Sequence, residues 1–233
     1  MSSPLSRLFE STVARNPSWP YVAPFAVFLG FLALSPHLPV GPGISYPMRV
    51  VTVSAVAVLW SRGVISLKAS RLGASCVLGV AVFVIWIAPD LLWPGYRAHW
   101  LFQNPITGSL ESTVPSMARA DPVFLIWRAA GSILLVPIVE ELFWRAWLMR
   151  YAISQDFRKV PLGAYSAQSF WICALLFATE HGPYWDVGLA AGILYNWWMI
   201  RTRSLADCII AHAVTNACLA AYLLHYGRWE YWL

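Results

Sequence analysis

Residues 123–147, VFLIWRAAGSILLVPIVEELFWRAW, hold two adjacent glutamates, Glu140 and Glu141, and Arg145 inside a mainly apolar run. About 20 apolar residues suffice for a helix to cross the hydrocarbon core of a bilayer, so this run predicts a membrane-spanning helix. Ionisable side chains at that depth are costly and are usually retained for function. The run therefore predicts a candidate active site inside the membrane.

The composition of the whole chain agrees with a membrane protein. The 233 residues are 59% hydrophobic and 12% charged, with a mean hydropathy of +0.59. Such values exclude an ordinary soluble domain. The net charge of +5 suits basic loops that face an anionic leaflet, and the sequence has no basic stripe interleaved with exposed aromatic residues. We therefore expect the lipid bilayer as a partner, and no nucleic acid.

Seven apolar runs predict an all-α, polytopic membrane bundle of seven or eight transmembrane helices. The second and sixth runs are short, so each either re-enters the membrane or extends into a flanking loop, and an eighth crossing stays open. A polar segment, residues 1–20, precedes a single domain, residues 21–233. The seven runs are residues 21–38, 47–60, 72–92, 123–147, 162–179, 187–200 and 205–224.

The distribution of basic residues predicts the orientation. Summed over alternate segments, Lys and Arg number ten on the N-terminal side and four on the other, where Arg49 is counted. The positive-inside rule then places the N-terminus inside the cell. The longest external connection, about residues 93–122, is expected to cap the site from outside. Because the soluble loops are short, we expect a multi-pass protein of a bacterial cytoplasmic membrane.

Glu140, Glu141 and Arg145 of the fourth run do not all lie on the same face of a helix. Glu141 and Arg145 are i and i+4 neighbours, so Arg145 can neutralise Glu141. Glu140 lies about 100° away around the helix, and its carboxylate stays available as a general base. The alternative is that all three form one structural ion-pair network.

Two further polar pairs lie on later apolar runs. Phe177 and His181 are four residues apart, and Gly182 and Pro183 then end the helix. A lone histidine at a helix end is more often a hydrogen-bonding residue than a catalyst. The neighbouring position holds the acidic Glu180, where an apolar residue would be expected. His212 and Asn216 share one face of residues 205–224, where polar side chains either bind neighbouring helices or serve a site.

The depths in the membrane that the sequence predicts for Glu140, His181 and His212 agree only in part. With a rise of 1.5 Å per residue, Glu140 lies about 15 Å and His212 about 12 Å from the inner ends of their helices. His181 would lie near the opposite end of a helix that starts at residue 162. A tilted or late-starting fifth helix would bring the three to one depth.

The three pairs together resemble a known family. Glu140 to Arg145 is similar to EExxxR, Phe177 to His181 to FxxxH, and His212 to Asn216 to HxxxN. These are the ordered motifs of the CPBP family, the CAAX protease and bacteriocin-processing (Abi) intramembrane endopeptidases. The similarity covers about residues 123–224. The sequence YPMR at residues 46–49 also resembles the branch found with exosortase-type protein-sorting systems, which would make such a system a partner.

The resemblance implies a glutamate intramembrane protease that needs no cofactor. Glu140 would act with His181 to activate a water, and His212 and Asn216 would bind the oxyanion. Glu141, Arg145 and Phe177 would support them. Nothing in these residues separates a prenylated CAAX tail, a bacteriocin leader or a membrane-anchored sorting signal, and we favour a membrane-anchored protein or peptide as the substrate.

Two other classes of function stay open. Glu140, His181 and His212 could hold zinc in a metalloprotease, although the sequence has neither HExxH nor paired cysteines. Alternatively, the same residues could form a relay in a non-enzymatic transporter or scaffold. Internal repeats with matching broken helices would favour transport, and the sequence shows none.

Overall fold

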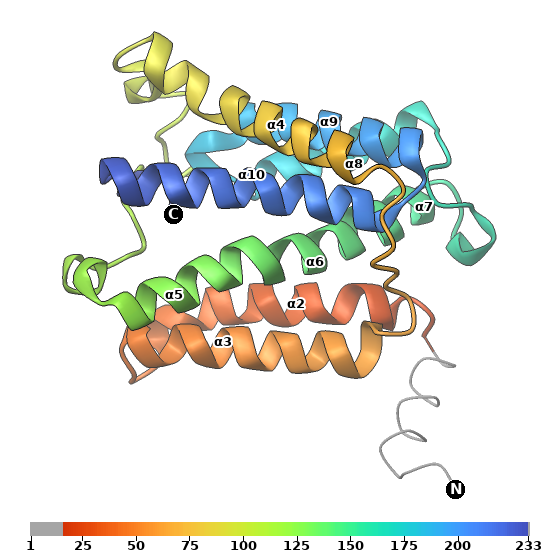
Figure 1. The fold of residues 1–233 in the computed structure, drawn as a ribbon, viewed down its shortest axis with the longest axis horizontal. Helices are drawn as coiled ribbons and strands as arrows, with labels where there is room; N and C mark the ends of the chain where they lie inside the picture. Colours follow the sequence, from red (N-terminus) through yellow and green to blue (C-terminus); the bar gives the residue numbers. More distant parts are fainter. Residues whose placement is uncertain (1–15, 233) are drawn as a thin grey trace, which may run out of the picture.

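The computed structural model describes residues 16–232, and every regular element in that range is helical. Most of the expected polar segment, residues 1–15, lies outside the described residues. Figure 1 shows the helices as a bundle with their long axes roughly aligned. The α-helices are α2 (Trp19–Leu34), α3 (Pro42–Val56), α4 (Leu72–Leu92), α5 (Pro122–Ala130), α6 (Val136–Glu141), α7 (Met149–Tyr151), α8 (Ala167–Thr179), α9 (Trp185–Thr202) and α10 (Leu205–Tyr226).

Five helical segments in the described range are long and apolar enough to cross a membrane. The all-α membrane bundle is therefore confirmed, whereas the expected seven or eight crossings are not. α8 has only 13 residues, and α9, with 18, is not among the five. The five segments are Trp19–His37, Pro42–Ser61, Leu72–Leu92, Pro122–Tyr151 and Leu205–Tyr226.

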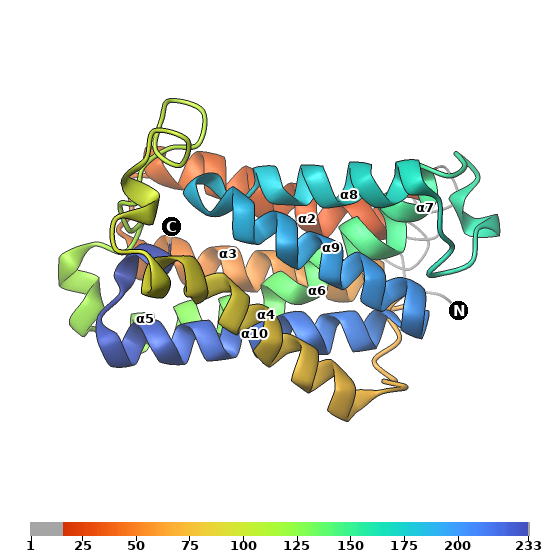
Figure 2. The ribbon, with the colours of Figure 1, turned by 90° about the horizontal axis from the view of Figure 1, so that it is seen from above.

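The fifth expected run begins later than its hydropathy indicates. Residues 162–166 form a turn and an extended connection, with Gly163 at a φ of +73°, and the side chain of Ser166 then caps α8 by accepting from Ser169 N. The late start shortens α8 and lets His181, just beyond its end, lie at the depth of the other motif residues. α8 and α9 lie side by side as an antiparallel pair (Figure 2).

The helix that carries the glutamates is continuous from Pro122 to Tyr151 but is not regular. The Asp121 carboxylate caps its start by accepting from Val123 N and Phe124 N. Two π-helical segments, Gly131–Leu135 and Leu142–Leu148, flank α6, which ends in Glu140 and Glu141. Such π segments are rare and often mark functional sites.

α10 lies at the centre of the bundle, between α4 and the α5–α6 helix (Figure 1). Gly79 of α4 makes the close contact because a Cβ there would come within 2.4 Å of Ala211 O. The Thr215 hydroxyl fastens the same crossing by donating to Gly79 O at 2.8 Å. α10 can therefore present its polar residues to both neighbours.

The second membrane segment starts earlier than expected. α3 begins at Pro42 and not at residue 47, and Arg49 lies well inside the helix and is buried, whereas the orientation count assigned it to the outer side of the membrane. The physical reason is that proline is well suited to the first turn of a helix, where its missing N–H costs nothing. The described structure thus places one buried arginine in the N-terminal hairpin of α2 and α3.

Candidate active site

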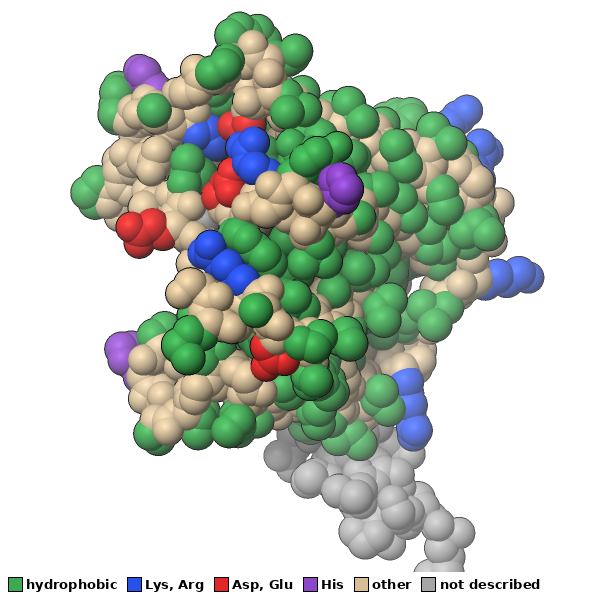
Figure 3. Space-filling view, turned by 60° about the vertical axis from the view of Figure 1, so that its left-hand side comes forward, with side chains coloured by type: hydrophobic (Ala, Val, Ile, Leu, Met, Phe, Trp, Pro, Cys, Tyr) green, Lys and Arg blue, Asp and Glu red, His purple; other side chains and the backbone are tan. Residues whose placement is uncertain are grey.

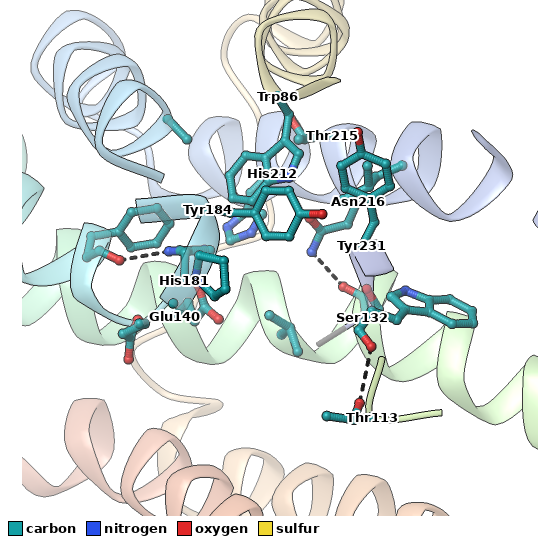
Figure 4. A pocket seen from close by; sticks show the side chains of 18 of the residues that line it. Trp86, Thr113, Ser132, Glu140, His181, Tyr184, His212, Thr215, Asn216 and Tyr231 are labelled. Atoms are coloured by element: carbon teal, nitrogen blue, oxygen red, sulfur yellow. Dashed lines mark hydrogen bonds between the residues drawn. The ribbon is translucent and has the colours of Figure 1, made fainter. Parts of the chain in front are cut away.

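One cavity of about 510 Å³ brings the expected catalytic residues together. Its lining includes Glu140 from α6, His181 from the end of α8, and His212 and Asn216 from α10. Figure 4 shows Glu140, His181 and His212 near one another, with Asn216 farther along the cavity beside Ser132. Residues separated by more than 70 positions in the sequence therefore face one space.

The two adjacent glutamates have different surroundings. Glu141 is fully buried, and its Oε1 accepts from Arg145 Nη1 at 3.1 Å and contacts His212 Nδ1 at 2.9 Å. Glu140 lines the cavity instead, and its Oε2 has no hydrogen-bond partner among the described residues. The i to i+4 spacing correctly predicts that Arg145 lies against Glu141 and that Glu140 points elsewhere.

Arg145 is held by a network that also reaches α9. Its Nε donates to Asn196 Oδ1 at 3.1 Å, and Asn196 Nδ2 in turn donates to Phe170 O at 2.9 Å. Its guanidinium lies 4.3 Å from the centre of the Phe177 ring. The sequence motifs do not include Asn196, although a fully buried asparagine within an apolar run was a signal that could have found it.

His212 and Asn216, which share one helix face, have different partners. The His212 ring stacks on Tyr195 with centroids 5.1 Å apart, while its Nδ1 faces the Glu141 carboxylate. An ionised carboxylate can only accept a hydrogen bond, so Nδ1 of His212 is the donor in this contact. Nε2 is then the only other polar atom of the His212 side chain.

Asn216 reaches across to the irregular part of the α5–α6 helix. Its Nδ2 donates to Ser132 O at 2.8 Å. In this π segment Val136 N bonds to Gly131 O, and the next position, Pro137, has no N–H to offer to Ser132 O. Asn216 therefore supplies the donor that the helix itself lacks, and one amide hydrogen of Nδ2 is left.

His181 is fixed in one tautomer by its own helix. Its Nδ1 lies 2.8 Å from Phe177 O, and because a carbonyl oxygen can only accept, Nδ1 donates. In the neutral ring Nε2 then keeps its lone pair. The edge of Trp86 packs on the ring at 5.1 Å, and a Cβ on Gly188 would come within 2.9 Å of Nδ1. Trp86 and Gly188 belong to no motif, and no local pattern indicates them.

The acid beside His181 belongs to the cavity wall. Glu180 lines the cavity, and its Oε2 accepts from Trp144 Nε1 at 3.0 Å. Asp186, the other nearby acid, pairs instead with the buried Arg97 at 2.8 Å. His181 is therefore not part of a surface ion pair with either acid.

The loop between α4 and α5 closes one end of the cavity, as its position in the chain predicts. Thr107, Glu111 and Thr113 contribute to the lining together with the C-terminal Tyr231 and Trp232. Trp232 O accepts from Thr113 N at 3.1 Å, which ties the C-terminal segment to the loop. Figure 3 shows this end of the molecule hollowed, with basic and acidic side chains around the hollow.

Tyrosines near the same end act as neutral hydrogen-bond donors. Burial, followed by the hydrogen bond to Asp90, raises the pKa of Tyr231 above its ordinary value. Burial and the nearby Asp186 carboxylate likewise raise the pKa of Tyr96. Both phenols therefore stay protonated at neutral pH and help to anchor the cap.

The zinc hypothesis requires Glu140, His181 and His212 to converge on one ion. Within residues 16–232, no three His, Cys, Asp or Glu side chains are placed to hold a metal ion. Two of the imidazole nitrogens are directed at Phe177 O and at Glu141. The described arrangement gives this hypothesis no preformed set of ligands.

Comparison with protein families identifies the segment that carries the site. Residues 122–218 match the family model described as type II CAAX prenyl endopeptidase Rce1-like. Searches of curated proteins and of solved structures found no match. The matched segment contains EExxxR, FxxxH and HxxxN, whereas α2, α3 and α4 lie outside it. Within residues 122–218 the chain is therefore similar to the CAAX-protease (CPBP) family of membrane endopeptidases.

Proposed function

We propose that the protein is an intramembrane endopeptidase in which Glu140 activates a water molecule for attack on a peptide carbonyl. The observation that carries this proposal is the position of Glu140, whose Oε2 has no described partner in a cavity lined by two histidines. A carboxylate without an internal donor can accept the proton of a bound water. Glu141 also has an Oε2 without a described partner, but it does not line the cavity, and its Oε1 is committed to Arg145 and His212.

His181 is proposed to assist in water activation. Its Nδ1 hydrogen is directed at Phe177 O, so Nε2 can accept a hydrogen bond from water. Trp86, Phe177 and the close approach of Gly188 restrict the orientation of the ring. Holding a base within about 1 Å of its productive position is a large part of catalytic efficiency.

His212 and Asn216 are proposed to stabilise the oxyanion. With a proton on each ring nitrogen, His212 would keep its Nδ1 contact with Glu141 and donate through Nε2, and Asn216 would donate through its remaining amide hydrogen. In a site that excludes water, one such donor contributes about 2.7–4 kcal/mol to transition-state stabilisation. On this proposal, Glu141 orients the His212 ring in addition to anchoring Arg145.

The proposed substrate is a membrane-associated protein or peptide cleaved near its terminus. The matched family model is described as a type II CAAX prenyl endopeptidase, and a CAAX motif lies at the C-terminus of a protein. We further propose one domain for residues 21–233 and a bacterial cytoplasmic membrane, with an exosortase-type sorting system as partner. The short connections between helices and the YPMR sequence at residues 46–49 support the last two statements.

Reconstituted protein with a peptide substrate tests this function. Wild-type protein and Glu140→Gln are placed in liposomes with a prenylated CAAX peptide and with its unprenylated form, and the products are identified by mass spectrometry. We expect Glu140→Gln to lower kcat by about 10²–10⁴-fold, because the amide keeps the shape but cannot take a proton.

Glu230→Gln serves as the matched control. Glu230 pairs with Arg228 and does not line the described cavities, so its removal is expected to leave the rate unchanged. Thermal unfolding of each variant shows whether the fold is intact. Cleavage by Glu140→Gln at the wild-type rate would show that Glu140 is not the base.

A further inference from the structure

A second cavity, of about 380 Å³, lies at the end of the bundle where α2 joins α3. Its walls come from that connection, from α3, from Phe124 of α5 and from the loop at Val114. In Figure 1 the α2–α3 connection lies at the left, at the same end as the start of α5. Ligand cavities usually have volumes of about 300–1,000 Å³, so this space is large enough for a small polar group such as a lipid headgroup.

Arg49 is the buried charged group of α3 that lines this cavity. It is only 6% exposed, and its guanidinium lies 4.3 Å from the centre of the Tyr46 ring and 5.4 Å from that of Phe28. Within residues 16–232, no carboxylate forms an ion pair with Arg49. The Tyr46 hydroxyl is a polar neighbour, but a neutral hydroxyl does not balance the charge. A buried guanidinium in a membrane helix is costly unless it meets an anion, so its position indicates an anion-binding site.

Ser45 adds a hydroxyl on the same face of α3. Ser45 and Arg49 are i and i+4 neighbours on the helix, and both line the second cavity. Ser45 is 8% exposed, and its hydroxyl forms no hydrogen bond with another residue in the range 16–232. Buried polar groups normally have a hydrogen-bond partner, so two such groups that face one cavity indicate a shared ligand. Both are donors, which suits an anion.

Tyr46 restricts the position of the Arg49 side chain. The Tyr46 hydroxyl donates to the backbone oxygen of Arg128 at 3.2 Å, which fixes the ring against α5. α3 and α5 can approach this closely because of Gly131, where a Cβ would come within 2.5 Å of the Tyr46 hydroxyl. The guanidinium of Arg49 therefore packs on a ring that is itself held between two helices.

The surroundings of the cavity favour a lipid over a soluble anion. Ile44 and Met48, which precede the two polar residues in the sequence, are 57% and 46% exposed on a helix that is long and apolar enough to cross a membrane. Leu32 and Val40 are also exposed, and both border the cavity. Arg49 follows the first residue of the segment Pro42–Ser61 by seven positions, about 10 Å along the axis. It therefore lies in the half of the segment that is nearer to the headgroups at this end.

We propose that Arg49 and Ser45 bind the phosphate group of an anionic membrane lipid, with its acyl chains against the exposed apolar residues of the α2–α3 hairpin. A guanidinium presents paired N–H donors that match two phosphate oxygens. Basic pockets between transmembrane helices are a known form of headgroup site. A headgroup such as phosphatidylglycerol balances the charge of Arg49, whereas a zwitterionic headgroup brings a cation of its own. Neither residue lines the catalytic cavity, so this site is independent of the proposed function.

A displacement experiment in detergent tests this site without any assay of proteolysis. The purified full-length protein in dodecyl maltoside is titrated into fluorescently labelled phosphatidylglycerol, and binding is followed by anisotropy. The probe is then displaced with unlabelled phosphatidylglycerol, with phosphatidylcholine of the same acyl chains, or with inorganic phosphate. We expect phosphatidylglycerol to be about tenfold more effective than phosphatidylcholine, because hydrogen bonds to charged groups are the strong ones. Inorganic phosphate should not displace the probe.

Substitutions at the two donors should remove this preference. Arg49→Gln should lower the affinity for phosphatidylglycerol about tenfold, to that for phosphatidylcholine. Arg49→Lys should keep part of the preference because it keeps the charge without the paired donors. Ser45→Ala, which removes a donor but no charge, should lower the affinity about 2–10-fold. Phosphatidylglycerol should also raise the unfolding temperature of the wild-type protein, since a ligand of the folded state stabilises it.

Arg228→Gln is the matched control. Arg228 lies at the same end of the bundle, pairs with Glu230 and lines neither cavity, so its removal should leave the preference unchanged. Equal displacement by the two lipids, or a preference that persists in Arg49→Gln, would overturn the proposal. Displacement by inorganic phosphate as effective as that by phosphatidylglycerol would assign the cavity to a soluble anion instead. If Arg49→Gln does not fold, unchanged affinities in both Arg49→Lys and Ser45→Ala would overturn the lipid site.

Discussion

Arg145 in the matched segment and Arg49 in the N-terminal hairpin are both buried arginines in membrane helices, but they have different neighbours. Arg145 bonds to Glu141 and Asn196 and lies over Phe177. Arg49 has aromatic rings as neighbours, and no described carboxylate pairs with it. A charge paired within the protein stabilises its neighbours, whereas a charge facing a cavity is available to a ligand. The buried arginine of the matched segment is thus paired with protein groups, whereas that of the N-terminal hairpin lines a cavity.

The largest expected effect is the loss of stability on breaking the paired arginine. Arg145→Ala removes the guanidinium from the buried Glu141, which keeps only its contact with His212, and the free energy of unfolding should fall by about 3–5 kcal/mol. Arg49→Gln should cost much less, because no described carboxylate loses its ion partner. Thermal or denaturant unfolding in detergent measures both changes.

An exposed ion pair provides the control for Arg145. Lys159 and Asp156 form a 2.8 Å pair on the surface, and Lys159→Ala should leave the unfolding transition unchanged because solvent screens this pair. If Arg145→Ala unfolded like wild-type protein, or if Arg49→Gln were the more destabilised variant, the contrast between the two arginines would be wrong.

A smaller effect, on activity and not on stability, is expected from Gly188→Ala, because Gly188 lies against the His181 ring. The Cβ of Gly188→Ala would come within 2.9 Å of His181 Nδ1, so the ring must shift. A displacement of about 1 Å in a catalytic group can cost about 10²-fold in rate. We therefore expect kcat to fall by about 10–100-fold, measured with the peptide substrate, with little change in KM.

Gly30→Ala is the matched substitution for this prediction. A Cβ at Gly30 of α2 would meet nothing within 4 Å, and its activity should equal that of wild-type protein. Unchanged kcat in Gly188→Ala would show that the position of His181 does not limit the reaction.

The smallest effect is expected from metal removal. The described site has no preformed group of metal ligands, so treatment with a chelator should change the rate by less than about twofold. The purified active protein should contain well under one zinc per chain by elemental analysis. Stoichiometric zinc that is lost together with activity in Glu140→Ala, His181→Ala and His212→Ala would instead support a metalloprotease.

The residue pattern predicted much of the fold and of the candidate site. The run 72–92 coincides with α4, and the spacing of Glu141 and Arg145 places them in contact. These features depend on hydrophobicity and helical periodicity, which are local properties. The short α8 was missed because a turn at Gly163 and a cap at Ser166 ended an apolar run that hydropathy alone would extend.

The sequence by itself determined that this is an all-helical membrane protein with polar motif residues on three separate apolar segments. Ionisable side chains are costly inside a bilayer, so their presence within apolar runs is a local signal that the sequence alone reveals. Only the tertiary structure decided which groups meet. It paired His212 with Glu141, directed Asn216 to Ser132 O, brought Trp86 and Gly188 against His181, and placed Arg49 in a cavity beside the site. These contacts join residues far apart in the chain, and they depend on how the helices cross and where the backbone departs from regular helix, which no local pattern specifies.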